Sequence, residues 1–331
     1  MAVDIDIPKA VDRFKETKIK AFPCHSNWVS SAGYECDRRL TYQRVAWQKK
    51  ILHDVGLQYI FDEGNRIEAS IRQELTDAGF ELVEDQRPFN WPEKEISGKI
   101  DFKAVVKTEV DGKIRVQRIP IECKSINPYD FQTIKDRDIE SVKNHKKPHI
   151  RGYLAQIMLY LLLDNVEWGI LLFKDKNGGR YKQIDVQIDM AFLEQVIQKF
   201  ERVNAAVKAY KEAQSDDDRA AALPARITDL TVCKHCPFRT ECLPDVSFGE
   251  GIKIVSDAYL EQLLLKREAT LASASEYDDA DKELKELTKK RADNKEAHFI
   301  VNGRWELTVK NHGKGLRVDA SRLGQAVPTE E

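Results

Sequence analysis

The sequence predicts an α/β (α+β) protein in which a large domain is followed by a smaller extension. Apolar residues recur at helical spacing over residues 37–54 and 60–78. Short runs bounded by turn residues then predict strands, beginning with Phe80–Glu84 and Arg87–Trp91. A length of 331 residues, with 42% hydrophobic and 33% charged residues, suits one large domain that carries an appendage.

The strongest strand signal is a hairpin in the middle of the chain. Residues 98–106 and 119–125 both have strand character, and Asp111-Gly112 between them is a strong two-residue turn signal. With this turn, Asp101 faces Glu122 directly across an antiparallel pair. Because side chains alternate along a strand, Glu122 and Lys124 share one face of it.

This pairing of carboxylates indicates a metal-dependent phosphodiesterase site. The Cβ atoms of directly opposed residues lie about 5 Å apart, where like charges repel unless a cation offsets them. A divalent cation does so, and Lys124 supplies a further positive charge. The alternative is a surface hairpin with scattered charges. Pro120 implies an edge strand or a bulge, and a bulge would shift the pairing.

The middle of the chain alternates further helices and strands. Residues 130–148 are polar and lysine-rich, which indicates a mobile loop or a short helix, whereas the apolar residues 149–165 indicate a buried helix. The remaining expected elements are a hairpin of Trp168–Asp175 with Arg180–Gln187, a long helix over about 190–214, and a charged linker at 215–219.

The character of the chain changes after Cys242. Residues 256–295 have the pattern of two charged amphipathic helices, and Asn302-Gly303 predicts a two-residue hairpin turn between Phe299–Val301 and Arg304–Lys310. We therefore expect a first domain over residues 1–248 and a second over 249–331.

Three cysteines lie within ten residues, which points to metal ligation. Cys233, Cys236 and Cys242 have the spacing C-x2-C-x5-C. Such thiolates bind zinc or an iron–sulfur cluster, and the spacing leaves both open. Three ligands call for a fourth, for which Cys36 is the candidate and Cys24 the competitor. His235 is a further candidate ligand for zinc.

Three more polar residues have positions that suit a catalytic site. Glu68 follows Gly64 by one helical turn and is a candidate third metal ligand, although an exposed helical glutamate is commoner. Gln156 and Tyr160 share one face of an otherwise apolar helix, so both need polar partners. A phosphate or a metal-bound water would serve, and so would internal hydrogen bonds.

A lysine-rich segment before that helix is the best candidate for binding a phosphate backbone. The net charge of -2 does not indicate a polyanion ligand, so nucleic-acid binding requires a local basic patch. The alternative is a solvated loop. The residues of the segment are Lys143, Lys146, Lys147, His149 and Arg151.

Nothing in the sequence indicates a membrane or secretory role. No apolar stretch reaches the roughly 20 residues of a spanning helix, and Met-Ala-Val-Asp-Ile-Asp lacks the features of a signal peptide. We therefore expect a cytoplasmic protein without a membrane partner.

Taken in order, these residues resemble a known nuclease superfamily. The order is a cysteine, a helical acid, an Asp, Glu-x-Lys, Gln-x3-Tyr and three cysteines. Over about residues 22–245 it resembles the PD-(D/E)XK superfamily, and within it the RecB-like nucleases with a four-cysteine cluster. It is most similar to the CRISPR-associated iron–sulfur exonucleases (the fourth Cas protein family) and their phage-borne relatives.

The resemblance implies a restriction-endonuclease-like core, with a central mixed sheet flanked by helices and an iron–sulfur clasp. Asp101 and Glu122 would bind Mg²⁺ or Mn²⁺, and Lys124 would hold the scissile phosphate or orient the attacking water. Gln156 and Tyr160 would contact the substrate. The implied ligands of a [4Fe–4S] cluster, which the resemblance favours over zinc, are Cys36, Cys233, Cys236 and Cys242.

The chain departs from the RecB-like pattern at one position. RecB-like members usually carry histidine where this chain has Glu68. Lambda-type phage exonucleases (the YqaJ-like group) carry glutamate there, and an oxygen ligand suits Mg²⁺ or Mn²⁺.

We therefore expect a metal-dependent DNA exonuclease that acts on single strands or DNA ends, in phage or prokaryotic recombination, repair or replication. One alternative is a CRISPR-adaptation nuclease that trims prespacers beside an integrase. Another is a non-catalytic scaffold that binds DNA ends. The expected partner is DNA, and a homo-oligomer or a recombination partner stays open.

Overall fold

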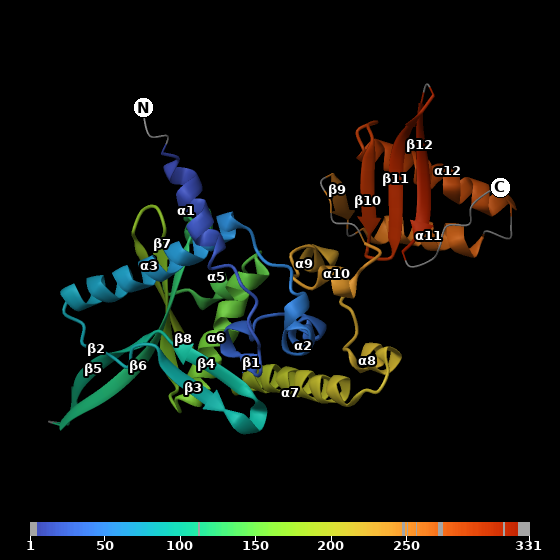
Figure 1. Cartoon of the computed structure of the whole chain (residues 1–331). Coiled ribbons are helices and arrows are strands. Elements are labelled where there is room, and N and C mark those ends of the chain that lie inside the picture. Colours follow the sequence, from blue (N-terminus) through green and yellow to red (C-terminus); the bar gives the residue numbers. More distant parts are fainter. Residues whose placement is uncertain are drawn as a thin grey trace. The chain divides into compact units, whose positions relative to one another are not determined.

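The computed structural model describes residues 5–111, 113–246, 249, 251–255, 257–270, 274–313 and 315–323. The chain divides into two compact units, Met1–Ala225 and Arg226–Glu331 (Figure 1). This division falls before the cysteine-rich segment, whereas the sequence suggested residue 248. The earlier position has a local reason, because a Cβ at Gly303 would lie only 2.9 Å from the carbonyl oxygen of Thr228.

The first unit is built around a five-stranded mixed sheet with the strand order β2-β5-β6-β7-β8. Only β6 and β7 pair in parallel, and helix α6 (Pro148–Leu163) lies in the connection between them. The predicted α/β class, with a mixed sheet flanked by helices, is confirmed. The strands are β2 (Leu82–Val83), β5 (Phe102–Val110), β6 (Lys113–Ile126), β7 (Trp168–Asp175) and β8 (Tyr181–Gln187).

Helices cover both faces of this sheet. Leu171 packs with Ile157 of α6 in the main core, whereas its neighbour Leu172 packs with Ile71 of α3 (Val55–Asp77) in a second core. Because side chains alternate along a strand, these neighbours point to opposite faces. Cys123 lies in the core on the α3 side, so Glu122 and Lys124 point to the α6 side.

The predicted register of the β5–β6 hairpin is confirmed. Pairing runs without a break from Phe102↔Ile121 to Val110↔Lys113. The predicted strand pair of Asp101 with Glu122 is wrong, because Asp101 precedes β5 and lies outside the ladder. Asp111 has a φ of 52°, as a type I′ turn requires, and Gly112 lies outside the described residues. No bulge occurs at Pro120, which pairs with Lys103. The β6–β7 pairing begins only at Ile121, so the missing N–H of Pro120 interrupts no bond of that ladder.

The strand expected over residues 98–106 is in fact two strands that belong to different sheets. β4 (Ile96–Ile100) pairs with β3 (Arg87–Trp91) and with β1 (Asn27–Trp28) in a three-stranded sheet. Asp101 lies between β4 and β5, where the chain passes from one sheet to the other.

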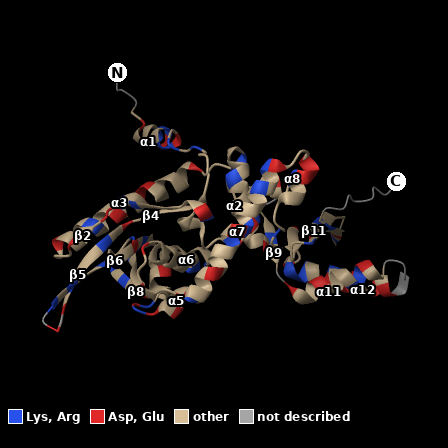
Figure 2. Cartoon of the chain, turned by 90° about the horizontal axis from the view of Figure 1, so that it is seen from below, with Lys and Arg blue, Asp and Glu red and all other residues tan. Residues whose placement is uncertain are grey.

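Two further expectations for the first unit are wrong. The helix predicted over 37–54 ends at Val45, because Ala46 leaves helical geometry at a φ of -139°. The charged segment 215–219 is not a linker but the start of α8 (Asp216–Ala222), whose acidic first turn is visible in Figure 2. Ser215 caps this helix by accepting a 3.1 Å bond from the amide of Asp218, and acidic residues suit a helix N-terminus.

The remaining helices of the first unit are mostly short. The segment 130–148, expected as a mobile loop or short helix, contains two of them. The elements are α1 (Ile7–Glu16), η1 (Val29–Ser31), α2 (Asp37–Val45), η2 (Trp47–Lys49), η3 (Pro92–Lys94), α4 (Pro128–Thr133), α5 (Ile139–Lys143) and α7 (Met190–Glu212).

The second unit has its own four-stranded sheet, with the order β12-β11-β10-β9 and a separate apolar core. Two helices occur where the sequence suggested a helical pair. The hairpin loop, however, has three residues, Asn302–Arg304, because Val301 pairs with Trp305. The elements are α9 (Leu230–Lys234), α10 (Arg239–Cys242), β9 (Ile252–Val255), α11 (Ala258–Ala269), α12 (Ala274–Arg291), β10 (Ala297–Val301), β11 (Trp305–His312) and β12 (Gly315–Arg322).

Among the residues that the structure describes, no helix has the length and hydropathy needed to cross a lipid bilayer.

Candidate active site

The candidate site lies where β6 continues past the N-terminal end of β5. The last residue pair of these strands is Phe102↔Ile121, but β6 continues to Ile126 beside β7. Asp101 directly precedes β5, so its side chain lies beside the part of β6 that has no partner in β5. Its Oδ2 accepts a 2.8 Å hydrogen bond from the backbone N–H of Cys123. The break between β4 and β5 thus positions the Asp101 carboxylate beside β6.

Glu122 is the most deeply buried acid of the site. Its side chain is 1% exposed, and its Oε1 accepts bonds from Lys124 Nζ at 2.5 Å and from Gln156 Nε2 at 2.6 Å. Lys124 Nζ also lies 5.1 Å from the centre of the Tyr153 ring. The second oxygen of Glu122, Oε2, is buried and has no hydrogen-bond partner among the described residues. An unpartnered buried carboxylate oxygen is costly, which indicates that it serves a ligand.

Gln156 and Tyr160 of α6 find different partners. Gln156 bonds Glu122, whereas the Tyr160 hydroxyl accepts a 3.2 Å bond from the backbone N–H of Lys99 in β4. A Cβ at Gly98 would lie 3.0 Å from the same hydroxyl, so Tyr160 packs closely against β4. The structure thus provides internal partners for both residues, and their contact with the substrate stays a prediction.

Glu68 lies in the middle of α3 rather than near its start. The helix begins at Val55, with Asp54 as the N-cap, which is earlier than the helical pattern over 60–78 suggested. The Glu68 side chain is half-buried and accepts a 2.6 Å bond from Gln86 Nε2. It lies close enough to Asp101 for the negative charge of Asp101 to raise the pKa of Glu68, in addition to the effect of burial.

The acids of the site disfavour one another's charge. Burial raises the pKa of Glu122 to about 8, and the charge of Asp101 adds to this effect. Burial also raises the pKa of Asp101, against the attraction of Lys124. Burial opposes the charge of Lys124, but Glu122 and Asp101 outweigh it, so the lysine pKa lies above its ordinary value. Lys124 attracts all three acids and Lys99 also attracts Asp101, yet the pKa of each acid stays above its ordinary value, which leaves the site short of positive charge.

The donor set fits a hard divalent cation. As the side chains lie, no group of three or more His, Cys, Asp and Glu residues within the described ranges is arranged as a metal site. Lys124 and Gln156 engage one oxygen of Glu122, and Gln86 engages one of Glu68. The buried Oε2 of Glu122 and the shortage of positive charge are what an oxygen-ligated Mg²⁺ or Mn²⁺ would satisfy.

Gln86 belongs to this site, although nothing in its sequence context marks it. Its backbone N–H donates a 2.9 Å bond to the carbonyl of Asp101, and its side-chain amide bonds Glu68. It holds a φ of 49°, a left-handed conformation that is unfavourable for a residue with a Cβ. The loop before β3 thus places one amide side chain against Glu68 and one backbone N–H against Asp101.

Gln86→Gly removes the side-chain contact of Gln86 with Glu68 and keeps its backbone contact with Asp101. We expect metal affinity and cleavage to fall by roughly 10–100-fold, as for other residues that orient metal ligands. Glycine adopts a positive φ freely, so unfolding free energy should change by less than about 1 kcal/mol. The measurements are metal titration by calorimetry, cleavage rate and chemical denaturation. Asp293→Gly, at an exposed residue with a φ of 53°, is the matched control. Full activity of Gln86→Gly would refute the positioning role.

The lysine-rich segment is ordered into α5 and the start of α6, and most of its charges are paired. Lys143 bonds Glu140 at 2.9 Å, Lys147 bonds Asp130 at 2.7 Å, and Arg151 bonds Glu35 at 3.1 Å. Lys146 is exposed. The segment therefore does not form the continuous cationic surface that its sequence suggested, and its role in substrate binding stays a prediction.

The four cysteines of the predicted cluster are distributed between the two units. Cys36 Sγ accepts a 3.4 Å bond from the amide of Arg39 at the start of α2. Cys233, Cys236 and Cys242 lie on or beside α9 and α10 in the second unit. The four-cysteine cluster therefore stays a prediction. The competitor Cys24 is buried and donates a 3.2 Å bond to the carbonyl of Ser26.

Comparisons with known proteins give matches among solved structures alone. No family model matches the chain, and no curated protein matches its sequence. The chain is similar to the crystal structure of SSO0001, with 18% identity, 74% of this chain and 100% of that chain covered, and a TM-score of 0.40. It is also similar to LHK-Exo, an alkaline exonuclease from Laribacter hongkongensis, with 14% identity, 60% and 95% covered, and a TM-score of 0.38. For the structure of LHK-Exo in complex with dAMP, the identity is 15%, 60% of this chain and 94% of that chain are covered, and the TM-score is 0.37.

Proposed function

We propose that this protein is a metal-dependent deoxyribonuclease, a hydrolase of phosphodiester bonds that acts as an exonuclease on single-stranded DNA or DNA ends. The observation that carries the proposal is the buried Glu122, whose Oε1 is held by Lys124 and Gln156 while its Oε2 has no partner among the described residues. A buried acid with a pKa of about 8 and an unpartnered oxygen is the kind of perturbed group that gathers at functional sites.

The residues of the site have separable roles. Glu68, Asp101 and Glu122 would hold Mg²⁺ or Mn²⁺, which supplies a more acidic water and neutralises charge on the phosphate. The ammonium of Lys124 stays protonated at neutral pH, because its pKa lies above the ordinary value. It is thus placed to donate to an oxygen of the scissile phosphate and to stabilise negative charge there.

The two residues of α6 act as positioning residues. Gln156 holds one oxygen of Glu122, which leaves the other free for a metal. Tyr160 anchors β4 through the backbone of Lys99, two residues before Asp101. Both roles act through another residue and require no contact with the substrate.

A cavity of about 660 Å³ beside Glu68 offers a route for the substrate. Glu68 and Gln86 line it, together with Asn65 and Arg72 of α3. We propose that one strand of DNA reaches the carboxylates there. Lys146, with Lys143, Lys147 and Arg151 where their present partners release them, would contact the backbone farther along the strand.

A cleavage assay on labelled DNA tests the proposed function. Single- and double-stranded substrates, with free and with blocked ends, are incubated with Mg²⁺, Mn²⁺ or a chelator. We expect the loss of terminal nucleotides from free ends with either metal and none with the chelator. Binding of DNA ends without cleavage under any metal would instead identify a non-catalytic scaffold.

The predicted iron–sulfur cluster has its own test. We propose that Cys36, Cys233, Cys236 and Cys242 hold a [4Fe–4S] cluster with a structural role, because none of them belongs to the carboxylate site. Protein purified without oxygen should be brown, and Cys233→Ser should lose the colour and melt at a lower temperature. Cys24→Ala, outside the proposed ligand set, is the control and should keep the colour. A colourless wild-type protein with one zinc per chain would identify zinc as the metal.

A further inference from the structure

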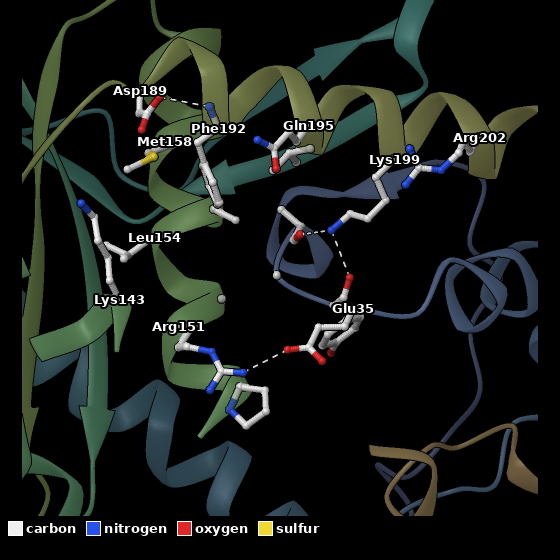
Figure 3. A pocket seen from close by; sticks show the side chains of 17 residues that line it. Glu35, Lys143, Arg151, Leu154, Met158, Asp189, Phe192, Gln195, Lys199 and Arg202 are labelled. Atoms are coloured by element: carbon white, nitrogen blue, oxygen red, sulfur yellow. Dashed lines mark hydrogen bonds and ion pairs between the residues drawn. The ribbon is translucent and has the colours of Figure 1, made fainter. Parts of the chain in front are cut away.

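A second cavity of the first unit lies away from the carboxylates. It has a volume of about 570 Å³ and is bounded by residues 32–35, α6 and α7 (Figure 3). The α6 residues that line it include Arg151, Leu154 and Met158. At 100° per residue these lie on the opposite side of the helix from Gln156 and Tyr160. The cavity is therefore separate from the candidate active site.

The walls of this cavity are apolar and tightly built. Leu154 and Met158 are each 4% exposed and Val196 is 5% exposed, so they form a closed wall. The half-buried ring of Phe192 projects between α6 and α7 in Figure 3. The backbones of Gly33 and Gly152 also meet here, since a Cβ on Gly33 would lie 2.2 Å from the Cα of Gly152. A flat, apolar group would fit against such a wall.

The polar groups of the cavity are mainly cationic. Its two acids are already engaged: Asp189 caps α7 by accepting a 3.0 Å bond from the amide of Phe192, and Glu35 pairs with Arg151. Three of the lining cations also have acidic partners: Lys143 pairs with Glu140, Arg151 with Glu35 and Arg202 with Asp37. The attraction for an anion therefore rests on Lys199 and on Arg151, whose partner Glu35 is exposed. The four cations are Lys143, Arg151, Lys199 and Arg202.

Lys199 is the most informative of these cations. Its ammonium donates bonds to the carbonyl oxygens of Ala32 and Tyr34. An ammonium has three N–H donors, so one is left for a ligand. No carboxylate in the described part of the chain forms an ion pair with Lys199, and burial lowers its pKa to about 8. A bound anion would stabilise the charged form of Lys199, which burial disfavours.

One neighbouring ion pair can give way to an anion. The Glu35 side chain that pairs with Arg151 is 50% exposed. A doubly charged phosphate can displace such a carboxylate from an arginine, because it binds the guanidinium more strongly.

We propose that this cavity binds a phosphate monoester with a planar aromatic body. The phosphate lies at Arg151 and Lys199 in place of the Glu35 carboxylate, and the planar body lies against Phe192 and Leu154. This is the chemistry of a free nucleoside monophosphate or of the phosphorylated end of a nucleic-acid strand. The volume is within the range of roughly 300–1,000 Å³ that is usual for small-ligand sites. The proposal does not depend on the cleavage reaction, since the catalytic residues lie on the other side of α6.

Calorimetry of the full chain in chelating buffer tests the proposal, because the chelator removes metal-dependent binding at the carboxylates. The probes are inorganic phosphate, phenyl phosphate and thymidine 5′-monophosphate. We expect the two aromatic esters to bind roughly tenfold or more tightly than inorganic phosphate, because each buried CH₂-sized group contributes about 0.8 kcal/mol.

Two substitutions test the location of the site. Gln195→Glu adds a negative charge to an exposed lining residue and should weaken both esters roughly tenfold, whereas Glu35→Gln frees Arg151 and should strengthen them several-fold. Gln198→Glu, the same change at an exposed position of α7 outside the cavity lining, should leave both affinities unchanged. No binding of either ester, or equal binding by wild type and Gln195→Glu, would overturn the proposal.

Two oligonucleotides distinguish the sources of the phosphate. A 5′-phosphorylated strand that binds more tightly than its 5′-hydroxyl counterpart, with the difference lost in Gln195→Glu, assigns the cavity to strand ends. Equal binding of the two strands, alongside binding of the monophosphate, assigns it to free nucleotides. Either result supports the site, whatever the cleavage assay shows.

Discussion

Asp101→Asn is expected to lower metal-dependent DNA cleavage by about 10³-fold or more, because removing charge stabilisation from a transition state costs several kcal/mol. The asparagine keeps the shape of the side chain, and its oxygen can still accept the 2.8 Å bond from the amide of Cys123. The fold should therefore be retained. The measurements are the single-turnover cleavage rate with Mg²⁺ or Mn²⁺ and the melting temperature of the metal-free protein.

The same hairpin offers a matched control. Asp111→Asn makes the identical change at the turn, where the φ of 52° suits asparagine, and should leave cleavage unchanged. Asp101→Ala is expected to lose both activity and stability, since it leaves the buried N–H of Cys123 without a partner at a cost of about 1–3 kcal/mol. Cleavage by Asp101→Asn at the wild-type rate would remove this residue from the site and with it the proposed metal ligation.

Glu122→Gln is expected to change how the stability of the metal-free protein depends on pH. The pKa of Glu122 rises from 4.5 to about 8 on folding, so the folded state binds more protons than the unfolded state between these values. The unfolding free energy contributed by this group is therefore fully present below pH 4.5 and falls as pH rises towards 8. The slope is at most about 1.4 kcal/mol per pH unit. Glutamine cannot ionise, so the unfolding free energy of the variant should lack this pH-dependent contribution.

Chemical denaturation of both proteins between pH 5 and pH 8.5 measures this effect as the difference between the two curves. Glu109→Gln, on the exposed part of the same hairpin, should follow the wild type. Mg²⁺ should stabilise the wild type more at pH 8 than at pH 6, because metal binding requires the ionised carboxylate. Parallel curves for wild type and Glu122→Gln would show that Glu122 ionises normally and would remove the electrostatic basis of the proposed site.

The hairpin shows how much of the candidate site is local in origin. Asp111 holds the positive φ that a tight hairpin turn needs, the pairing follows the predicted register, and alternation along the strand then puts Glu122 and Lys124 on one face. Both follow from neighbouring residues and needed no knowledge of the rest of the chain. Pro120 did not disturb them, because β7 joins β6 only after that residue.

Other parts of the site depend on packing between distant segments. The break at Asp101 arises because β4 pairs with β1 and β3 in another sheet, and strand propensity alone does not reveal such a change of partner. Gln86 reaches Glu68 across 18 positions of sequence, from a backbone conformation that its residue type does not favour. The ion pairs of Lys147 with Asp130 and of Arg151 with Glu35 likewise join residues that lie far apart in the sequence.

The sequence by itself determined the α/β class, the register of the central hairpin and the shared face of Glu122 and Lys124, because turn chemistry and side-chain alternation act over a few residues. Only the tertiary structure decided which polar groups compensate these charges, since the pKa of Glu122 depends on burial by α6 and on the approach of Asp101. It also decided that a cavity forms between α6 and α7, with the ammonium of Lys199 held by two backbone carbonyls. Burial and long-range electrostatics are properties of the assembled core, and no local pattern of residues specifies them.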